Sequence, residues 1–99
     1  MSLEITATTW VYAIVEDPEK SETILGQEDA ESKIAFIPFF LEREAGQQCY
    51  PDLVRNRGQK YEIQAIMFED LCRYAMEGGY QLFALDADGR ILETYVPKQ

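Results

Sequence analysis

Two carboxylates and a glycine stand close together in ALDADGRILE, residues 84 to 93. Asp86, Asp88 and Gly89 have the spacing of three positions in an EF-hand calcium loop, where carboxylate oxygens bind the ion and glycine allows a sharp turn. The same Asp-Gly pair is also a strong signal for a tight hairpin turn, because both residues accept a positive φ. The residues around them decide between a calcium site and a hairpin.

Neither register of a calcium loop supplies the ligands that the ion needs. With Asp86 at the third position, Ala84 and Tyr95 fall on the first and last ligand positions, and neither carries a carboxylate. With Asp86 at the first position, Arg90 and Pro97 fall on ligand positions. The sequence therefore predicts a hairpin between two apolar strands and no metal site.

The chain contains no histidine, and its two cysteines, Cys49 and Cys72, stand far apart. The absence of histidine removes the commonest general base, the serine and cysteine triads and most zinc sites. Each cysteine falls on the apolar stripe of a predicted helix, where a thiol packs as a small hydrophobic side chain. We expect two buried free thiols that form no disulfide and act as no nucleophile.

Paired carboxylates remain as candidates for acid-base chemistry, with Glu69 beside Asp70 and Glu42 near Glu44. Residues one or two apart on a helix do not face each other. Acids in a first helical turn also have a structural role, because the helix dipole stabilises them. The glycines at 78–79 follow a helix instead of preceding one, so they form no phosphate-binding loop. The sequence predicts no catalytic residue and no cofactor.

One basic cluster, RNRGQK, stands out in an acidic chain. Arg55, Arg57 and Lys60 lie in it, between a predicted helix and the next predicted strand. Two interpretations remain open: a polar connecting loop, or a contact for an anionic ligand or an acidic partner surface. These three residues form the candidate binding site.

The elements that must position these residues follow from periodicity and turn signals. In chain order, they are strands at 9–15, 23–26 and 33–41, a helix at 41–49, a strand at 61–68, a helix at 68–79, and strands at 80–86 and 90–96. This order predicts an α+β fold with one mixed, mainly antiparallel sheet of about five to six strands and two helices packed on it.

Prolines and glycines qualify the predicted elements. Pro38 cannot donate to a strand ladder, so pairing should end near it or one side of its strand should be open. Pro51 should break or restart the first helix, whose apolar stripe is Leu41, Ala45 and Cys49. The second helix has the clearest pattern, because apolar residues at 68, 71, 72, 75 and 76 share one face and glycines supply its end.

The chain of 99 residues has a formal net charge of −9. A net charge of −5 lies between Glu16 and Lys33, where we expect an exposed hairpin or loop. The acidic field repels phosphate backbones and anionic lipids, so we expect neither nucleic acid nor a membrane as a partner. No apolar run has the length of a membrane span, and the start of the chain lacks a signal-peptide pattern. We expect a single domain, residues 1–99, in the cytoplasm.

Part of the chain resembles the N-terminal domain of the SseB (enhanced serine sensitivity) family. In IAFIPFFLEREAG, a strand that ends in proline and an aromatic residue leads into a helix; in FEDLCRYAMEGGYQLFALD, a helix ends at glycine before an apolar strand. The matching residues are Ile37, Pro38, Phe39 and Leu41, then Leu71, Ala75, Gly79 and the strand from Tyr80. The resemblance covers about half of the chain and departs at DADG, where family members tend to have an Asn-Pro turn. It implies a compact α+β module without an established catalytic role and assigns no functional residue.

These observations favour a small, non-catalytic protein-interaction module that acts through a sheet edge or the basic loop. The alternative is a small-ligand-binding protein or an enzyme that uses carboxylate and tyrosine groups. The first and last predicted strands carry few of the lysines that protect an exposed sheet edge. We therefore expect a protein partner, either a second copy in a symmetric dimer or a strand added by another protein.

Overall fold

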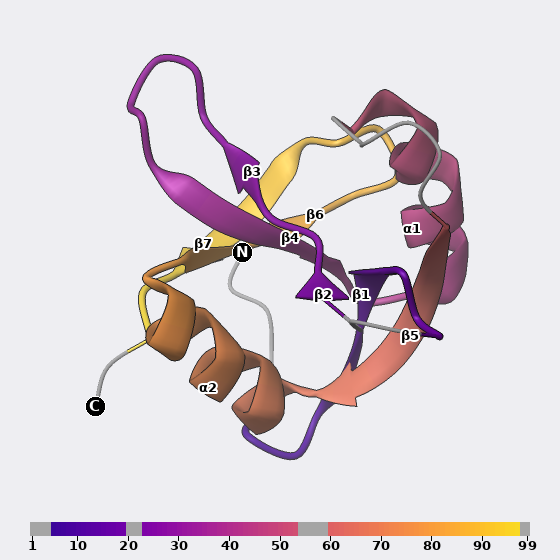
Figure 1. Ribbon diagram of the computed structural model, residues 1–99, viewed down its shortest axis with the longest axis horizontal. Helices are drawn as coiled ribbons and strands as arrows, with labels where there is room; N and C mark the ends of the chain where they lie inside the picture. Colours follow the sequence, from indigo (N-terminus) through magenta and orange to yellow (C-terminus); the bar gives the residue numbers. More distant parts are fainter. Residues whose placement is uncertain (1–4, 20–22, 54–59, 98–99) are drawn as a thin grey trace.

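The computed structural model describes residues 5–19, 23–53 and 60–97. The strands are β1 (Trp10–Glu16), β2 (Thr23–Ile24), β3 (Gln27–Glu28), β4 (Ala35–Phe40), β5 (Tyr61–Met67), β6 (Gln81–Leu85) and β7 (Ile91–Tyr95). The helices are α1 (Arg43–Cys49), a 3-10 turn at Tyr50–Asp52, and α2 (Phe68–Gly78). The described part of the chain is thus an α+β fold with one mixed sheet and two α-helices, as the sequence predicts (Figure 1).

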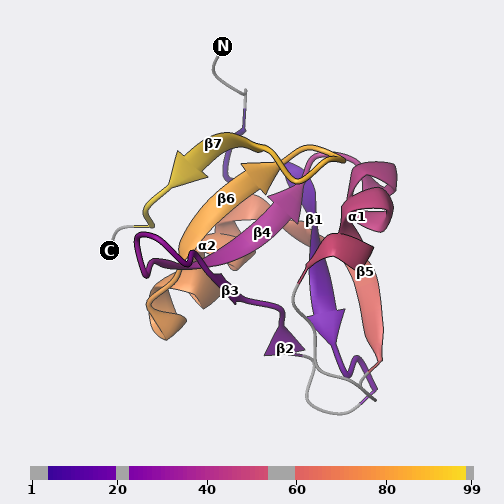
Figure 2. The ribbon, with the colours of Figure 1, turned by 90° about the horizontal axis from the view of Figure 1, so that it is seen from above.

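The sheet runs from β5 through β1, β4 and β6 to β7 (Figure 2). Only the β4–β6 pair is parallel among the pairs of described strands. β1 pairs with β5 on one side; on its other side, its first half meets β4 and its end meets β2. β3 pairs with the start of β4. Because β1 and β4 diverge, the short β2 and β3 fill the space between them.

The described residues form seven strands, more than the predicted five to six. We expected one short strand at 23–26, but this segment holds β2, and β3 follows it immediately. β2 pairs with β1, and β3 pairs with β4. The change of partner strand falls at Leu25 and Gly26, and the Leu25 N–H still donates to the Ile14 carbonyl of β1 at 2.7 Å. β2 and β3 have two residues each, which is too short for the alternation of apolar and polar residues that marks a strand in a sequence.

Pro38 lies in the central strand β4, fully buried, where a proline would ordinarily remove a ladder bond. The Ile34 carbonyl accepts from Asp29 on the β3 side, so by alternation the backbone at Pro38 faces that same side. Pairing with β3 ends at Phe36, and pairing with β1 begins at Phe39. The missing N–H of Pro38 therefore points into the gap between two ladders, which confirms the predicted interruption.

Two apolar layers cover the two faces of the sheet. The face under α2 is built from Val11, Ile37, Phe39, Leu71, Ala75, Leu82 and Ala84. The opposite face, partly covered by α1, is built from Ile14, Leu25, Phe40, Cys49, Phe83 and Leu85. Alternate residues of each central strand enter different layers, as the pleat of a strand requires. Figures 1 and 2 show α2 and α1 on these two sides of the sheet.

The first helix is shorter than the sequence predicts. It begins at Arg43, so Leu41 precedes it and is exposed instead of forming the start of the apolar stripe. Cys49 is fully buried, and Ala45 packs beside the same layer. Pro51 lies in the 3-10 turn that follows the helix, which confirms the predicted break.

The second helix agrees with its predicted pattern. Leu71 and Ala75 are fully buried, and Phe68 and Cys72 pack beside them. Gly79 ends the helix with a φ of 75°, in the left-handed region that glycine adopts without strain. The helix is thus held by one apolar face and a glycine C-cap.

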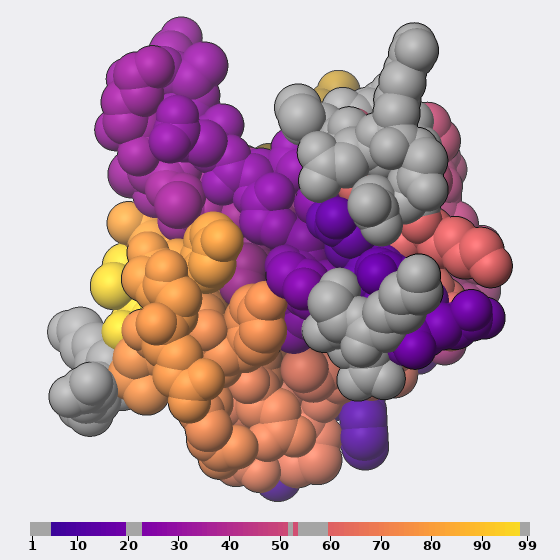
Figure 3. All heavy atoms as spheres, viewed as in Figure 1, coloured from indigo at the N-terminus to yellow at the C-terminus, as the bar shows by residue number. Residues whose placement is uncertain are grey.

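The acidic segment contributes the hairpin between β3 and β4, which projects from the body of the molecule at upper left in Figure 3. Asp29 closes this turn, because its carboxylate accepts from the Ser32 hydroxyl at 2.6 Å and from the Ser32 N–H at 3.3 Å. These bonds lower the pKa of Asp29. The side chains of residues 30–33 are exposed, as expected of a solvated acidic turn.

Candidate functional site

The hairpin that joins β6 to β7 contains Asp86, Asp88 and Gly89. The Asp86 carboxylate accepts from the backbone N–H of Asp88 and of Arg90, each at 2.9 Å. The Gly89 N–H donates to the Asp86 carbonyl at 3.0 Å, and Gly89 has a φ of 84°. Asp86 therefore binds the backbone of its own turn.

The hairpin is confirmed, but one detail of its prediction was wrong. Gly89 takes a positive φ and Asp88 does not. The loop is a turn followed by a left-handed glycine, a longer form than the two-residue turn that Asp-Gly suggests. In the part of the chain that the structure describes, no three acidic or cysteine side chains gather as they would around a metal ion.

The backbone of β7 faces outward at Thr94. The Asp86 N–H donates to the Arg90 carbonyl at 3.0 Å, so Asp86 faces β7, and by alternation Ala84 and Leu82 face it too. Their partners are Glu93 and Tyr95, whose backbone groups therefore bond to β6. The N–H and carbonyl of Thr94, between these two residues, point away from the sheet.

The edge formed by β7 also carries exposed apolar side chains. Ile91 is 56% exposed, Leu92 is 45% exposed, and Val96, just after the strand, is 61% exposed. The other large exposed apolar side chains of the described residues are Trp10 and Leu41, which lie apart in the sequence. The pairing with β6 shifts by one residue near Leu92, which marks a β-bulge. Backbone groups and apolar side chains thus face solvent along the same strand.

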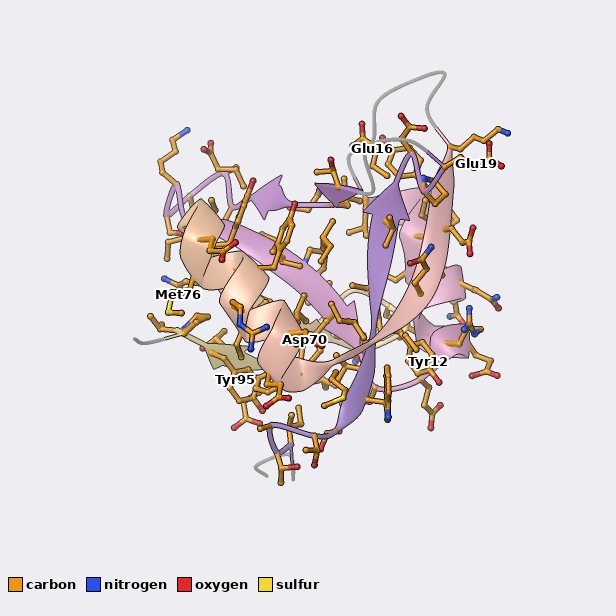
Figure 4. All side chains as sticks on the ribbon, turned by 60° about the horizontal axis from the view of Figure 1, so that its bottom comes forward. Tyr12, Glu16, Glu19, Asp70, Met76 and Tyr95 are labelled. Carbon is orange, nitrogen blue, oxygen red and sulfur yellow. The ribbon has the colours of Figure 1, made fainter. Side chains whose placement is uncertain are left out.

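The margins at β2 and β5 differ from β7, because a side chain binds one outward backbone group on each of them. On β2, the Ile24 N–H donates to the Tyr74 hydroxyl of α2 at 3.2 Å. On β5, the Ile63 carbonyl accepts from the Arg43 guanidinium of α1 at 2.7 Å. The Arg43 side chain also lies over the Tyr12 ring, 5.2 Å from its centroid. Figure 4 shows Tyr12 on the side of the sheet toward α1.

The sequence alone does not point to Arg43 or Tyr74. Each acts through a contact between elements distant in sequence: 20 residues separate Arg43 from Ile63, and 50 separate Tyr74 from Ile24. A single sequence carries no local pattern for such contacts. The structure is therefore needed to tell a protected edge from an open one.

Tyr95 anchors the edge strand to the core. Its ring lies 5.2 Å from the Phe68 ring and 6.0 Å from the Phe39 ring, centroid to centroid, and Figure 4 shows it beside the first turns of α2. Its hydroxyl donates to the Glu93 carboxylate at 3.0 Å. Burial raises the pKa of Tyr95 to about 12, with help from the hydrogen bond and the negative charge of Glu93. The side chains at 93 and 95 are thus fixed on the α2 face, which leaves Thr94 on the opposite face.

The basic cluster can be placed only in part. Lys60 lies just before β5, where its carbonyl accepts from the Asp17 N–H at 2.7 Å. Its ammonium group is 4.0 Å from the Glu19 carboxylate, and both side chains are exposed, so this ion pair contributes little stability. Arg55 and Arg57 lie outside the described residues. An anion contact at these three residues stays a prediction.

The paired carboxylates do not converge on a common point. Glu42 and Glu44 are both exposed at the start of α1. On α2, Glu69 is exposed and Asp70 accepts from the Arg73 guanidinium at 3.2 Å. Asp70 and Arg73 are one turn apart on the same helix, which is an ordinary surface ion pair.

The cysteines differ in their degree of burial. Cys49 is fully buried, as expected, whereas Cys72 on α2 is only partly buried. Burial nevertheless raises the pKa of the Cys72 thiol, which reduces its thiolate fraction near neutral pH. Both thiols are free.

A shallow hollow of about 310 Å³ lies between α1 and β5. Its lining residues are Arg43, Gln47, Tyr50, Tyr61, Glu62 and Ile63. The Tyr50 and Tyr61 rings contact each other with centroids 5.7 Å apart. Because the Arg43 guanidinium already binds a backbone carbonyl, it contributes to the structure of this hollow as well as to its charge.

Comparisons with protein-family models, with curated proteins and with solved structures found no match. In the described ranges of the chain, no helix is both long and apolar enough to cross a membrane. The candidate site is therefore defined by geometry: an edge strand with outward backbone groups and exposed apolar side chains, on a sheet where side chains bind one outward group of β2 and one of β5.

Proposed function

We propose that this protein is a small cytoplasmic, non-catalytic interaction module that binds an extended protein segment along β7. An incoming strand would extend the sheet and form backbone hydrogen bonds with the outward groups of Thr94. Side chains of the incoming strand would pack against Ile91, Leu92 and Val96. Backbone bonds would supply affinity, and these apolar contacts would supply preference for the segment's sequence.

The observation that carries this proposal is the contrast between the sheet margins. Arg43 binds the outward carbonyl of Ile63 on β5, and Tyr74 binds the outward amide of Ile24 on β2. Along β7, the described residues include one neighbouring strand, β6. Natural proteins usually protect an edge strand with charge, proline or a β-bulge. β7 has one charged residue, Glu93, and a bulge near Leu92, and Thr94 lies beyond that bulge.

The test is affinity capture from the native cell with two matched proline variants. Thr94→Pro removes an outward N–H from β7 and no bond to β6, so it should abolish capture without unfolding the protein. Ala65→Pro is the control. Lys60 faces β1 through its bond to Asp17, so by alternation the N–H of Ala65 faces outward on β5.

Partners lost with Thr94→Pro and retained with Ala65→Pro support the proposal. Equal capture by the wild-type protein and both variants would contradict it. Circular dichroism of each variant checks that the fold is intact.

A second candidate function is small-ligand binding in the hollow between α1 and β5. The observation in its favour is the presence of two tyrosines, a carboxylate and a guanidinium around one concave surface. Gln47→Ala would remove a lining amide that is exposed on α1. A ligand whose affinity falls in this variant, and not in Thr94→Pro, would favour the hollow over the edge.

A further inference from the structure

We infer that the segment that β7 binds is β7 of a second copy, in an antiparallel pair with Thr94 on the two-fold axis. This inference rests on the proposed function, because it uses the same edge, and it adds the identity and register of the partner. A two-fold axis perpendicular to a sheet requires one residue to face its own copy. The pattern of β7 determines which residue that is.

Thr94 is the residue whose backbone geometry fits the axis. Its N–H and carbonyl both point outward, so two copies of Thr94 can exchange two hydrogen bonds across the axis. A threonine opposite a threonine is also a favourable cross-strand pair. Placing Glu93 on the axis instead would make a non-hydrogen-bonded pair there, which sets two carboxylates directly against each other.

The neighbouring residues are complementary in the register that Thr94 sets. Glu93 of one copy lies opposite Tyr95 of the other. Each Glu93 carboxylate then lies between the Tyr95 hydroxyl of its own chain and that of the second copy, instead of beside another acid. Val96 of one copy lies opposite the Leu92 end of the other strand. Thr94 pairs with Phe83 and Ile91 with Leu85, so Ile91, Thr94 and Val96 lie on the same face of the sheet. On this face, Val96 of each copy covers the Ile91 end of the other strand.

The charge of this strand also favours a second copy. The chain has a formal net charge of −9, so most of its surface repels an identical molecule. Residues 90–97 carry one arginine and one glutamate, which sum to zero. The neutral strand is a place where two acidic copies can meet. Added salt should strengthen the association by screening the repulsion between the rest of the two molecules.

The first experiment is sedimentation equilibrium of the purified wild-type protein, Thr94→Pro and Ala65→Pro over a range of concentrations. The wild-type protein and Ala65→Pro should form dimers with similar affinity. Thr94→Pro should dissociate at least about tenfold more readily, because the two-fold axis doubles each lost hydrogen bond. A wild-type protein that stays monomeric at every concentration would overturn the inference.

The second experiment tests the register by cysteine substitution and mild oxidation. Thr94→Cys places two thiols on the axis, within the range of Cα separations that a disulfide spans. Val96→Cys places its two thiols about four residues apart along the strands, roughly 13 Å, which is too far. We expect a covalent dimer from Thr94→Cys and none from Val96→Cys. Equal cross-linking of both variants would contradict this register.

The two proposals fail in different ways. A monomeric wild-type protein whose capture of another protein is sensitive to Thr94→Pro would overturn the second-copy inference and leave the interaction module standing. A dimer that Thr94→Pro leaves intact would overturn the inference and place self-association on another surface. Retention of the fold by Thr94→Pro, checked by circular dichroism, makes each outcome interpretable.

Discussion

Tyr95 belongs to the edge strand β7 and packs against the core. The pH dependence of stability should therefore reflect how deeply its ring is buried. Its pKa is raised from 10.0 to about 12 in the folded protein, chiefly by burial. Between these two values an unfolded chain loses the phenol proton while the folded chain keeps it. Stability should therefore be fully present below pH 10 and fall as the pH rises toward 12.

Tyr95→Phe should remove this part of the pH dependence. The measurement is urea unfolding of the wild-type protein and the variant across this alkaline range, together with absorbance titration of tyrosinate. The difference between the two titrations should show one tyrosine with a pKa of about 12. A difference titration close to the ordinary tyrosine value would contradict the burial that the packing against Phe39 and Phe68 implies.

The two cysteines offer a second comparison between single side chains. Cys49 is fully buried and Cys72 is partly buried, so their replacement by alanine should have unequal costs. We expect Cys49→Ala to lower the free energy of unfolding by roughly 1 to 2 kcal/mol and Cys72→Ala by about 1 kcal/mol or less. Denaturant unfolding measures both. A larger loss for Cys72→Ala would show that α2 packs more tightly than its partial exposure indicates.

At the scale of elements, Gly79 determines where α2 ends. Its φ is 75°, and a Cβ built there would meet no heavy atom within 4 Å. The cost of Gly79→Ala is therefore almost wholly backbone strain, about 1 to 2 kcal/mol. Asparagine tolerates the left-handed region better than alanine.

Gly79→Asn should accordingly lose less stability than Gly79→Ala in thermal or denaturant unfolding. The same order would not be expected if the loss came from a steric clash, because asparagine is the larger residue. Equal losses for the two variants would therefore argue against strain as the cause.

Local patterns were enough to predict most of the elements. The apolar stripe of α2, the glycine after it and the Asp-Gly hairpin each depend on residues within a few positions of one another, and each is confirmed. Leu41 was placed in α1 by its spacing from Ala45 and Cys49, yet the chain enters the helix only at Arg43. Spacing alone does not reveal that Leu41 lies in the connection after β4.

Long-range contacts limited what could be predicted of the site. β5 and β7 each contain one charged residue, a glutamate, so their compositions do not distinguish them. The difference lies in the Arg43 guanidinium of α1, which binds the Ile63 carbonyl 20 residues further along the chain. The basic cluster is conspicuous in the sequence because its charge contrasts with the acidic chain. Of its three residues, the structure describes only Lys60, which pairs with the exposed Glu19. The sequence pattern thus identifies the charged cluster, whereas the outward backbone groups of β7 are seen only in the structure.

At the scale of the whole molecule, acidity and edge exposure act together. A net charge of −9 keeps identical molecules apart over most of their surface. Residues 90–97, whose charges sum to zero, then determine where two molecules can approach. An interaction at β7 would lengthen the row β5, β1, β4, β6 and β7 into a continuous sheet across two molecules without changing the packing of either core.

The most direct test of association through β7 is amide hydrogen exchange measured by NMR at low and high protein concentration. If β7 pairs with a second copy, the outward amide of Thr94 should exchange more slowly as concentration rises, while the outward amide of Ala65 on β5 stays unchanged. A Thr94 amide whose exchange rate is independent of concentration, in a solution where the protein is shown to associate, would contradict the account.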